Sequence, residues 1–151
     1  MERVSDSQDA ITVFVDFAHT DDALDKCLSS VRPLVPEGRD LWVVIGCGGC
    51  KDESKRPRMG RVASELATRC VFTSDNPRTE APSKIIAGMI EGVPLNQRSG
   101  VIVHADRNRA IRSAIEGAAP GDVVVLAGRG HETFQEIGSL EGGVLLSLIH
   151  I

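Results

Sequence analysis

The sequence predicts a doubly wound α/β fold, in which a mostly parallel, Rossmann-like sheet carries helices on both faces. Short runs of Val, Ile and Leu alternate with stretches whose apolar residues recur at helical spacing. The strand-like runs are apolar at nearly every position, which indicates strands covered on both faces and therefore paired in parallel. Strict alternation of strand and helix predicts right-handed crossovers, and 151 residues suffice for one such domain.

The first half of the chain supplies three strands and two helices. A helix is expected over residues 21–32, with Thr20 or Asp21 as its N-cap, because apolar residues recur there every three or four positions. A second helix is expected over residues 57–67, because Pro57 suits a first helical turn. The strands are expected at residues 11–15, 41–45 and 70–73, with Gly46 ending the second.

The second half repeats this alternation. Pro82 is expected to open a helix, and Asp106 is expected to cap another. Strands are expected at residues 101–103 and 122–127. In such sheets ligands bind beyond the carboxyl ends of the strands, which nominates the loops at 16–20, 46–56, 74–79 and 128–132. All four loops are polar or rich in glycine, so we expect one cleft with charges of both signs.

Composition excludes several classes of function. The net charge is −4, only 3% of residues are aromatic and there is no Tyr, so we expect no nucleic-acid partner. No apolar run approaches the ~20 residues that span a bilayer, and no leader precedes the first strand, so we expect a cytoplasmic protein without a membrane partner. Cys47 and Cys50 form one C-x-x-C pair, which is too few ligands for structural zinc, and no metal site is expected. A redox dithiol stays open.

The turn Asp75-Asn76-Pro77-Arg78 holds a carboxylate, an amide and a guanidinium directly after an expected strand. Pro77 restricts the backbone there, so donors and acceptors are held together, as a small zwitterion requires. Simple turn chemistry is the alternative.

Three further groups of residues lie in the other loops. Gly128 would let the backbone approach a ligand closely, and Glu132 would accept a hydrogen bond from an ammonium group. The alternative is that this loop only turns the chain. Asp16 and His19 would contact a nucleotide or cap the next helix. Lys55 and Arg56 would reach a phosphate or form a solvated pair. The loop at 46–49 lacks both the G-K-[ST] ending of a P-loop and the G-x-G-x-x-G fingerprint of a dinucleotide-binding site. No catalytic triad stands out, so no catalytic residue is assigned.

These motifs together resemble the C-terminal domain of the MurE-type Mur ligases over residues 1 to about 138. The resemblance rests on six ordered segments, at residues 15–20, 46–49, 55–57, 59–60, 74–78 and 128–133. It implies that residues 1–140 form this domain as a fragment, and that its partners are the N-terminal and central domains of the same ligase. Met1 is then expected to be an internal methionine, and residues 141–151 to be a non-native tail.

The resemblance also implies an activity. The family consists of cytoplasmic, ATP-dependent ligases of bacterial peptidoglycan synthesis, which add an amino acid to UDP-MurNAc-L-Ala-D-Glu. ATP and Mg²⁺, bound mainly by the central domain, convert a carboxyl group to an acyl phosphate that the incoming amine attacks. Members whose turn reads Asp-Asn-Pro-Arg use meso-diaminopimelate, whereas lysine-adding members differ there. The domain alone is expected to be inactive.

Residue roles follow only from this resemblance. Asn76 and Arg78 would bind the distal carboxylate of diaminopimelate, beside Asp75. Gly128 and Glu132 would hold its other end, so all these residues must share one pocket. Lys51 stands where the family has Arg, beside Cys50 in place of Asp, and it loses the bidentate fork. The nucleotide contacts would be Asp16, His19, Lys55 and Arg56.

Two other functions stay open from the sequence. The chain could be a stand-alone module that binds a small molecule, namely an amino acid. It could instead belong to another Mur-type ligase, such as a folylpolyglutamate synthase, although the 75–78 turn argues against that.

Overall fold

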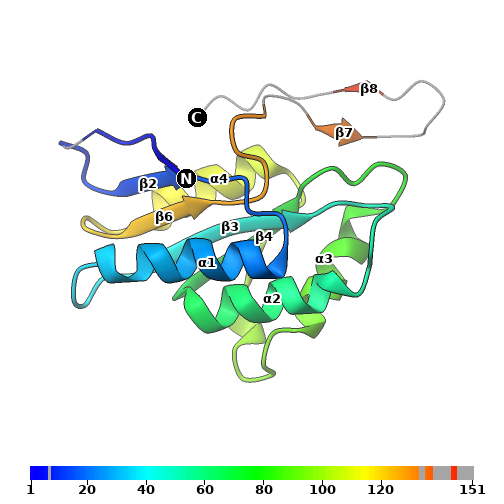
Figure 1. Ribbon diagram of the computed structural model, residues 1–151, viewed down its shortest axis with the longest axis horizontal. Helices are drawn as coiled ribbons and strands as arrows, with labels where there is room; N and C mark the ends of the chain where they lie inside the picture. The colour runs from blue at the N-terminus through cyan, green and yellow to red at the C-terminus, as the bar shows by residue number, and fades with distance from the viewer. Residues whose placement is uncertain (7, 133–134, 138–143, 146–151) are drawn as a thin grey trace.

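The computed structural model describes residues 1–6, 8–132, 135–137 and 144–145 (Figure 1). A six-stranded sheet forms the centre, in the order β1-β2-β6-β3-β4-β5. Strands β2 to β6 pair in parallel, and β1 pairs antiparallel with β2 at one edge. The mostly parallel sheet that the sequence predicts is therefore confirmed. The strands are β1 (Glu2–Arg3), β2 (Thr12–Val15), β3 (Leu41–Cys47), β4 (Arg69–Ser74), β5 (Ile102–Val103) and β6 (Val123–Leu126).

Helices cover both faces of the sheet, as predicted (Figure 1). The chain passes from β3 to β4 to β5 in one direction and then returns to β6. Because crossovers are right-handed, this reversal places the last helix on the face opposite the first three. The helices are α1 (Asp21–Val31), α2 (Lys55–Leu66), α3 (Pro82–Glu91) and α4 (Arg107–Gly117), with 3-10 turns at Arg32–Leu34 and Arg98–Gly100.

The core has two layers that share the sheet. Alternate residues of each strand point to opposite faces, so β3 is buried along its whole length. Val43 and Phe72 pack with α1, α2 and α3, whereas Val44 and Val71 pack with α4. At the amino end of the strands, the Trp42 ring nitrogen donates to Asp122 Oδ2 at 3.0 Å, which satisfies both buried groups.

The predicted helix caps are confirmed at two places. Thr20 accepts from the backbone N–H of Ala23 at 3.2 Å, and Asp106 accepts from that of Arg109 at 3.1 Å.

Other boundaries were predicted wrongly. Helix α2 begins at Lys55, two residues before Pro57. Strand β3 continues through Gly46, because the missing Cβ lets β4 approach: a Cβ there would lie 2.5 Å from the Thr73 carbonyl oxygen.

Three short strands were not predicted. Glu2–Arg3 is a two-residue, exposed edge strand without a periodic pattern. Strands β7 (Glu136–Ile137) and β8 (Val144–Leu145) form a separate antiparallel pair. The rest of the segment expected to be a non-native tail lies outside the described residues, apart from 144–145.

Within the part of the chain that the structure describes, no helix combines the length and apolar character needed to cross a bilayer.

Candidate functional site

One hollow of about 380 Å³ lies at the carboxyl edge of the sheet. All four of the loops nominated from the sequence contribute to it, so their predicted convergence is confirmed. It brings together all six predicted amino-acid-binding residues and two of the four predicted nucleotide-binding residues. Its lining consists of Phe17, His19, Thr20, Gly48, Lys51, Lys55, Asp75, Asn76, Arg78, Gly128 and Glu132.

The turn at residues 75–78 is docked on the loop that follows β3. Gly49 N–H donates to the Asn76 carbonyl at 2.8 Å, and Arg78 Nη1 donates to the Gly49 carbonyl at 2.9 Å. A Cβ at Gly49 would overlap the carbonyl oxygen of Pro77, so only glycine permits this approach. Arg78 and Cys50 both have positive φ, of 53° and 54°, which these contacts must hold in place. The two loops therefore form one rigid unit.

Arg129 is the central residue that sequence reasoning missed. It is 2% exposed, and its Nη1 donates to Asp75 Oδ1 at 2.9 Å and to Asn76 Oδ1 at 2.7 Å. Its Nη2 lies 3.2 Å from Glu132 Oε2. The flanking Gly128 and Gly130 have φ of 104° and 52°, a backbone path that glycine permits and that turns Arg129 inward. The signal in the sequence was an arginine with glycine on each side.

Two more buried side chains lie near this turn, and one of them, Gln135, contacts it. Gln135 Nε2 donates to the Asp75 carbonyl at 2.6 Å and to the Ser74 carbonyl at 3.2 Å. Arg107 Nη2 donates to the Ala127 carbonyl at 2.9 Å. Burial lowers the pKa of Arg107 to about 10, and nearby Asp75 opposes that change. Asp75 is thus held through its carboxylate by Arg129 and through its carbonyl by Gln135.

The predicted nucleotide-binding residues separate into two pairs. His19 and Lys55 line the hollow, and Lys55 Nζ donates to the His19 carbonyl at 3.2 Å. Asp16 and Arg56 are not among its lining residues. Asp16 Oδ1 accepts from Ala18 N–H at 2.8 Å, and the buried Arg56 donates to Glu80 at 2.6 Å. Nucleotide contact by any of the four stays a prediction.

The C-x-x-C pair has two unlike cysteines. Cys47 is buried, and burial raises its pKa to about 11. Cys50 is exposed, and a hydrogen bond with Thr79, whose Oγ1 lies 3.0 Å away, lowers its pKa. A redox dithiol needs two accessible sulfurs, so this geometry disfavours that alternative. Among the described residues, no three His, Cys, Asp or Glu side chains gather closely enough to hold a metal ion.

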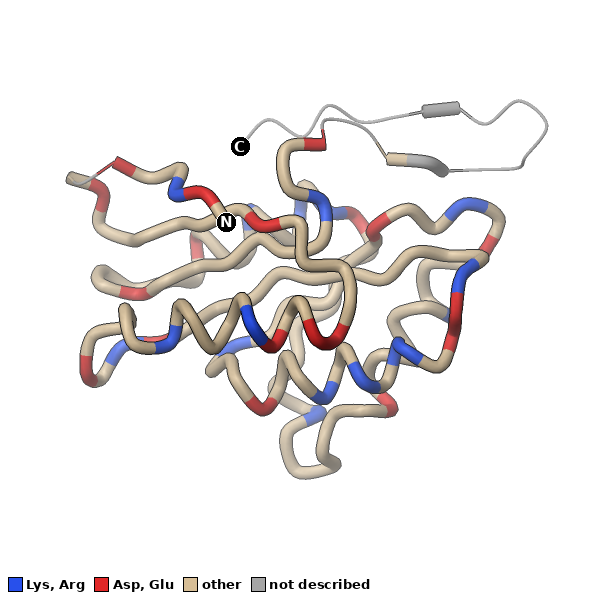
Figure 2. The backbone as a smooth tube through the Cα atoms, in the orientation of Figure 1, with Lys and Arg blue, Asp and Glu red and all other residues tan. Residues whose placement is uncertain are grey.

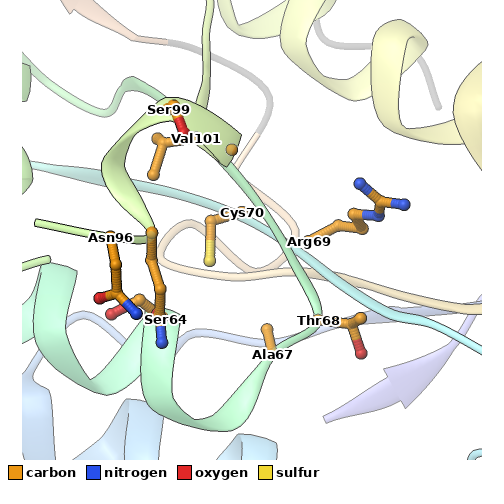
Figure 3. A pocket seen from close by; sticks show the side chains of 10 residues that line it. Ser64, Ala67, Thr68, Arg69, Cys70, Asn96, Ser99 and Val101 are labelled. Carbon is orange, nitrogen blue, oxygen red and sulfur yellow. The ribbon is translucent and has the colours of Figure 1, made fainter. Parts of the chain in front are cut away.

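A second hollow, of about 340 Å³, lies at the amino edge of the strands (Figure 3). Its one charged lining residue is Arg69, whose Nε donates to Asp40 at 3.1 Å. The loops after β3 and β4, at the other edge, carry charges of both signs (Figure 2). The carboxyl edge therefore offers the paired charges that a zwitterion requires.

The chain is similar to known proteins over most of its length. The chain is 50% identical over 139 residues to the UDP-N-acetylmuramoyl-L-alanyl-D-glutamate–2,6-diaminopimelate ligase of Synechococcus elongatus, covering 92% of this chain and 27% of that protein. A solved ligase of the same name superimposes with a TM-score of 0.83 at 38% identity, covering 97% of this chain and 29% of that one. The chain thus spans about a quarter of the length of the curated relatives it matches.

A more distant structure shares the fold alone. Folylpolyglutamate synthase of Mycobacterium tuberculosis, solved with ADP and AMPPCP, superimposes with a TM-score of 0.62 at 18% identity, covering 84% of this chain and 28% of that one. Residues 1–130 match the family described as Mur ligase, glutamate ligase domain. The chain therefore belongs to the Mur ligase family, in which it corresponds to the glutamate ligase domain.

Proposed function

We propose that this chain is the amino-acid-binding domain of an ATP-dependent ligase that joins meso-diaminopimelate to UDP-MurNAc-L-Ala-D-Glu in peptidoglycan synthesis. One observation carries the proposal: Lys51, Asn76 and Arg78 share a hollow with Asp75 and Glu132. Cations, an amide and carboxylates thus face one small space. Two relatives, 50% and 38% identical to this chain, are named for a ligase of 2,6-diaminopimelate.

The arrangement suits an amino acid that carries charges at both ends. Arg78 and the Asn76 amide would bind the distal carboxylate, for which a guanidinium provides a planar pair of donors. Glu132 would accept from an ammonium group, beside Gly128. The turn is already held by Gly49 and Arg129, so little ordering remains for the ligand to induce.

ATP and Mg²⁺ would be held mainly by another domain of the ligase. The glycine loop after β3 lies against Pro77 and Asn76 instead of offering its backbone to a phosphate. On this domain, Lys55 and His19 would reach the nucleotide from the rim of the hollow. ATP would supply the phosphoryl group that activates the carboxyl of the UDP-linked peptide. The proposal includes a cytoplasmic location, where ATP and a UDP-linked peptide would be supplied.

The contribution of this domain is then to position the amine. Holding the amino acid against an activated carboxyl replaces a bimolecular encounter with an oriented one. We therefore expect the 151-residue chain alone to have no ligase activity.

The folylpolyglutamate alternative is supported by likeness of fold alone, at 18% identity. The turn at 75–78 and the 50% identity to a diaminopimelate ligase favour the main proposal.

A chimera tests the proposal. Residues 1–137 replace the corresponding domain of the Synechococcus elongatus ligase, and ATP consumption is measured. We expect consumption only when meso-diaminopimelate and UDP-MurNAc-L-Ala-D-Glu are both supplied. Equal turnover with lysine would refute the proposed specificity. Calorimetry with meso-diaminopimelate on the 151-residue chain separates the stand-alone module, which should bind tightly without the other domains.

A further inference from the structure

Arg129 contacts three of the residues proposed to bind diaminopimelate, yet it does not line the hollow itself. It lies behind the Asp75-Asn76 turn with 2% of its surface exposed. Its shortest contact is the 2.7 Å hydrogen bond from Nη1 to Asn76 Oδ1. A residue placed in this way acts on a ligand only through its neighbours.

The contact defines the orientation of the Asn76 amide. A guanidinium has donors and no acceptor, so only the amide oxygen can face it. Arg129 lies behind the turn, whereas Asn76 lines the hollow. The NH₂ group is the other branch of the same planar amide, so it is directed away from Arg129.

The orientation matters for the ligand. A carboxylate only accepts hydrogen bonds, so it is bound by the NH₂ group and repelled by the carbonyl oxygen. The flipped amide orientation, which the Arg129 contact disfavours, would oppose binding. We propose that Arg129 is a positioning residue that fixes the Asn76 amide so that its N–H donors face the carboxylate of the incoming amino acid. This rests on the proposed function.

The same guanidinium links the turn to the loop after β6. Its contacts with Asp75 and Glu132 neutralise its buried charge. Gly128 and Gly130 give the backbone path that brings Arg129 under the turn. The glycine–arginine–glycine sequence thus serves the loop at 75–78, 53 residues earlier in the chain.

The test uses the chimera with R129M, N76A, R129M/N76A and N76D. We expect R129M to raise KM for meso-diaminopimelate about 10-fold to 100-fold, the usual effect of losing hydrogen bonds to charged groups. KM for ATP and for the UDP-linked peptide should change less than about 3-fold. In the N76A background the effect of R129M should be at least about 5-fold smaller, because residues that act through one another are not additive.

N76D tests the orientation of the Asn76 side-chain amide even if R129M fails to fold. It keeps the oxygen that faces Arg129 and replaces the NH₂ by a carboxylate oxygen, so KM for meso-diaminopimelate should rise more than about 100-fold. D122N is the control, since it also changes a buried charged residue, one that accepts from Trp42 at the amino end of the strands: we expect a lower Tm but less than about a 3-fold change in that KM.

Several results would overturn the inference: an unchanged KM in N76D, a joint rise of all three KM values in R129M, or full additivity with N76A. Failure of the proposed function is distinct, because the unmutated chimera would then show no turnover dependent on diaminopimelate.

Discussion

Lys51 is the residue at which the hollow differs most from what its proposed ligand requires. It lines the hollow beside Arg78 and provides a positive charge. An ammonium group is a point charge, whereas a guanidinium binds a carboxylate through two parallel hydrogen bonds. We therefore predict that Lys51→Arg lowers KM for meso-diaminopimelate in the chimera about 3-fold to 10-fold, with kcat unchanged.

Lys51→Met provides the opposite arm of this experiment. It keeps the length of the side chain and removes the charge, so KM for meso-diaminopimelate should rise. If neither variant changes that KM, Lys51 does not contact the amino acid.

At the scale of single elements, Gly49 joins the loop after β3 to the turn at 75–78. Any Cβ there would overlap the Pro77 carbonyl, so the turn would have to move. We predict that Gly49→Ala destabilises the 151-residue chain by about 1–3 kcal/mol, as overpacked sites do. Urea denaturation measures the change.

Gly100→Ala is the matched control, because nothing lies within 4 Å of its Cβ position. Its effect should stay within about 0.5 kcal/mol. The same Gly49→Ala exchange in the chimera should weaken binding of meso-diaminopimelate. Equal stability of the two alanine variants would show that the two loops are not held together through Gly49.

A second contact between elements joins α2 to the segment before α3. Glu80 accepts from the buried Arg56 at 2.6 Å and from Cys50 N–H at 2.7 Å. The Arg56 contact, followed by the Cys50 N–H, lowers the pKa of Glu80 from 4.5 to about 2. Because this pKa is lower in the folded state, the pair stabilises the fold above pH 4.5, and that stabilisation is lost as the pH falls toward 2.

We therefore predict that Glu80→Gln destabilises the chain by about 1–3 kcal/mol at pH 7, since it leaves the buried Arg56 with a weaker acceptor. The difference from wild type should shrink as the pH falls from 4.5 toward 2. Tm measured across that range checks it. Glu65→Gln is the control, because Glu65 and Arg61 form an exposed pair that contributes little. A difference that stays constant with pH would contradict the assignment to ionised Glu80.

The elements that the sequence predicted are those with a periodic apolar pattern or a cap, such as α4 behind Asp106. Strand β1 was not predicted, because its two exposed residues carry no periodic apolar pattern. The convergence of the loops followed from topology, since the carboxyl ends of parallel strands share an edge. Which side chains turn inward did not follow: Arg56 and Arg129 are buried by partners 24 and 53 residues away, and local spacing cannot reveal such pairs.

At the scale of the whole molecule, the four cysteines distinguish the core from the surface. Burial raises the pKa of Cys27 and Cys47 to about 11 and that of Cys70 to about 12, and all three belong to one core layer. Cys50 is exposed, and its bond to Thr79 lowers its pKa. Thiolates react and thiols do not, so Cys50 alone should be reactive in the folded chain.

We predict that a thiol reagent such as Ellman's reagent modifies one cysteine rapidly at pH 7 and the other three only as the core opens. In Cys50→Ser the rapid phase should disappear. The slow phase should accelerate with urea in parallel with global unfolding, because burial of Cys27, Cys47 and Cys70 depends on helices α1, α2 and α3 remaining packed on the sheet. A second rapid thiol that disappears in Cys47→Ser would mean that the loop after β3 opens by itself to expose Cys47. That result would contradict the rigid unit formed by this loop and the 75–78 turn, and with it the preformed hollow on which the proposed function depends.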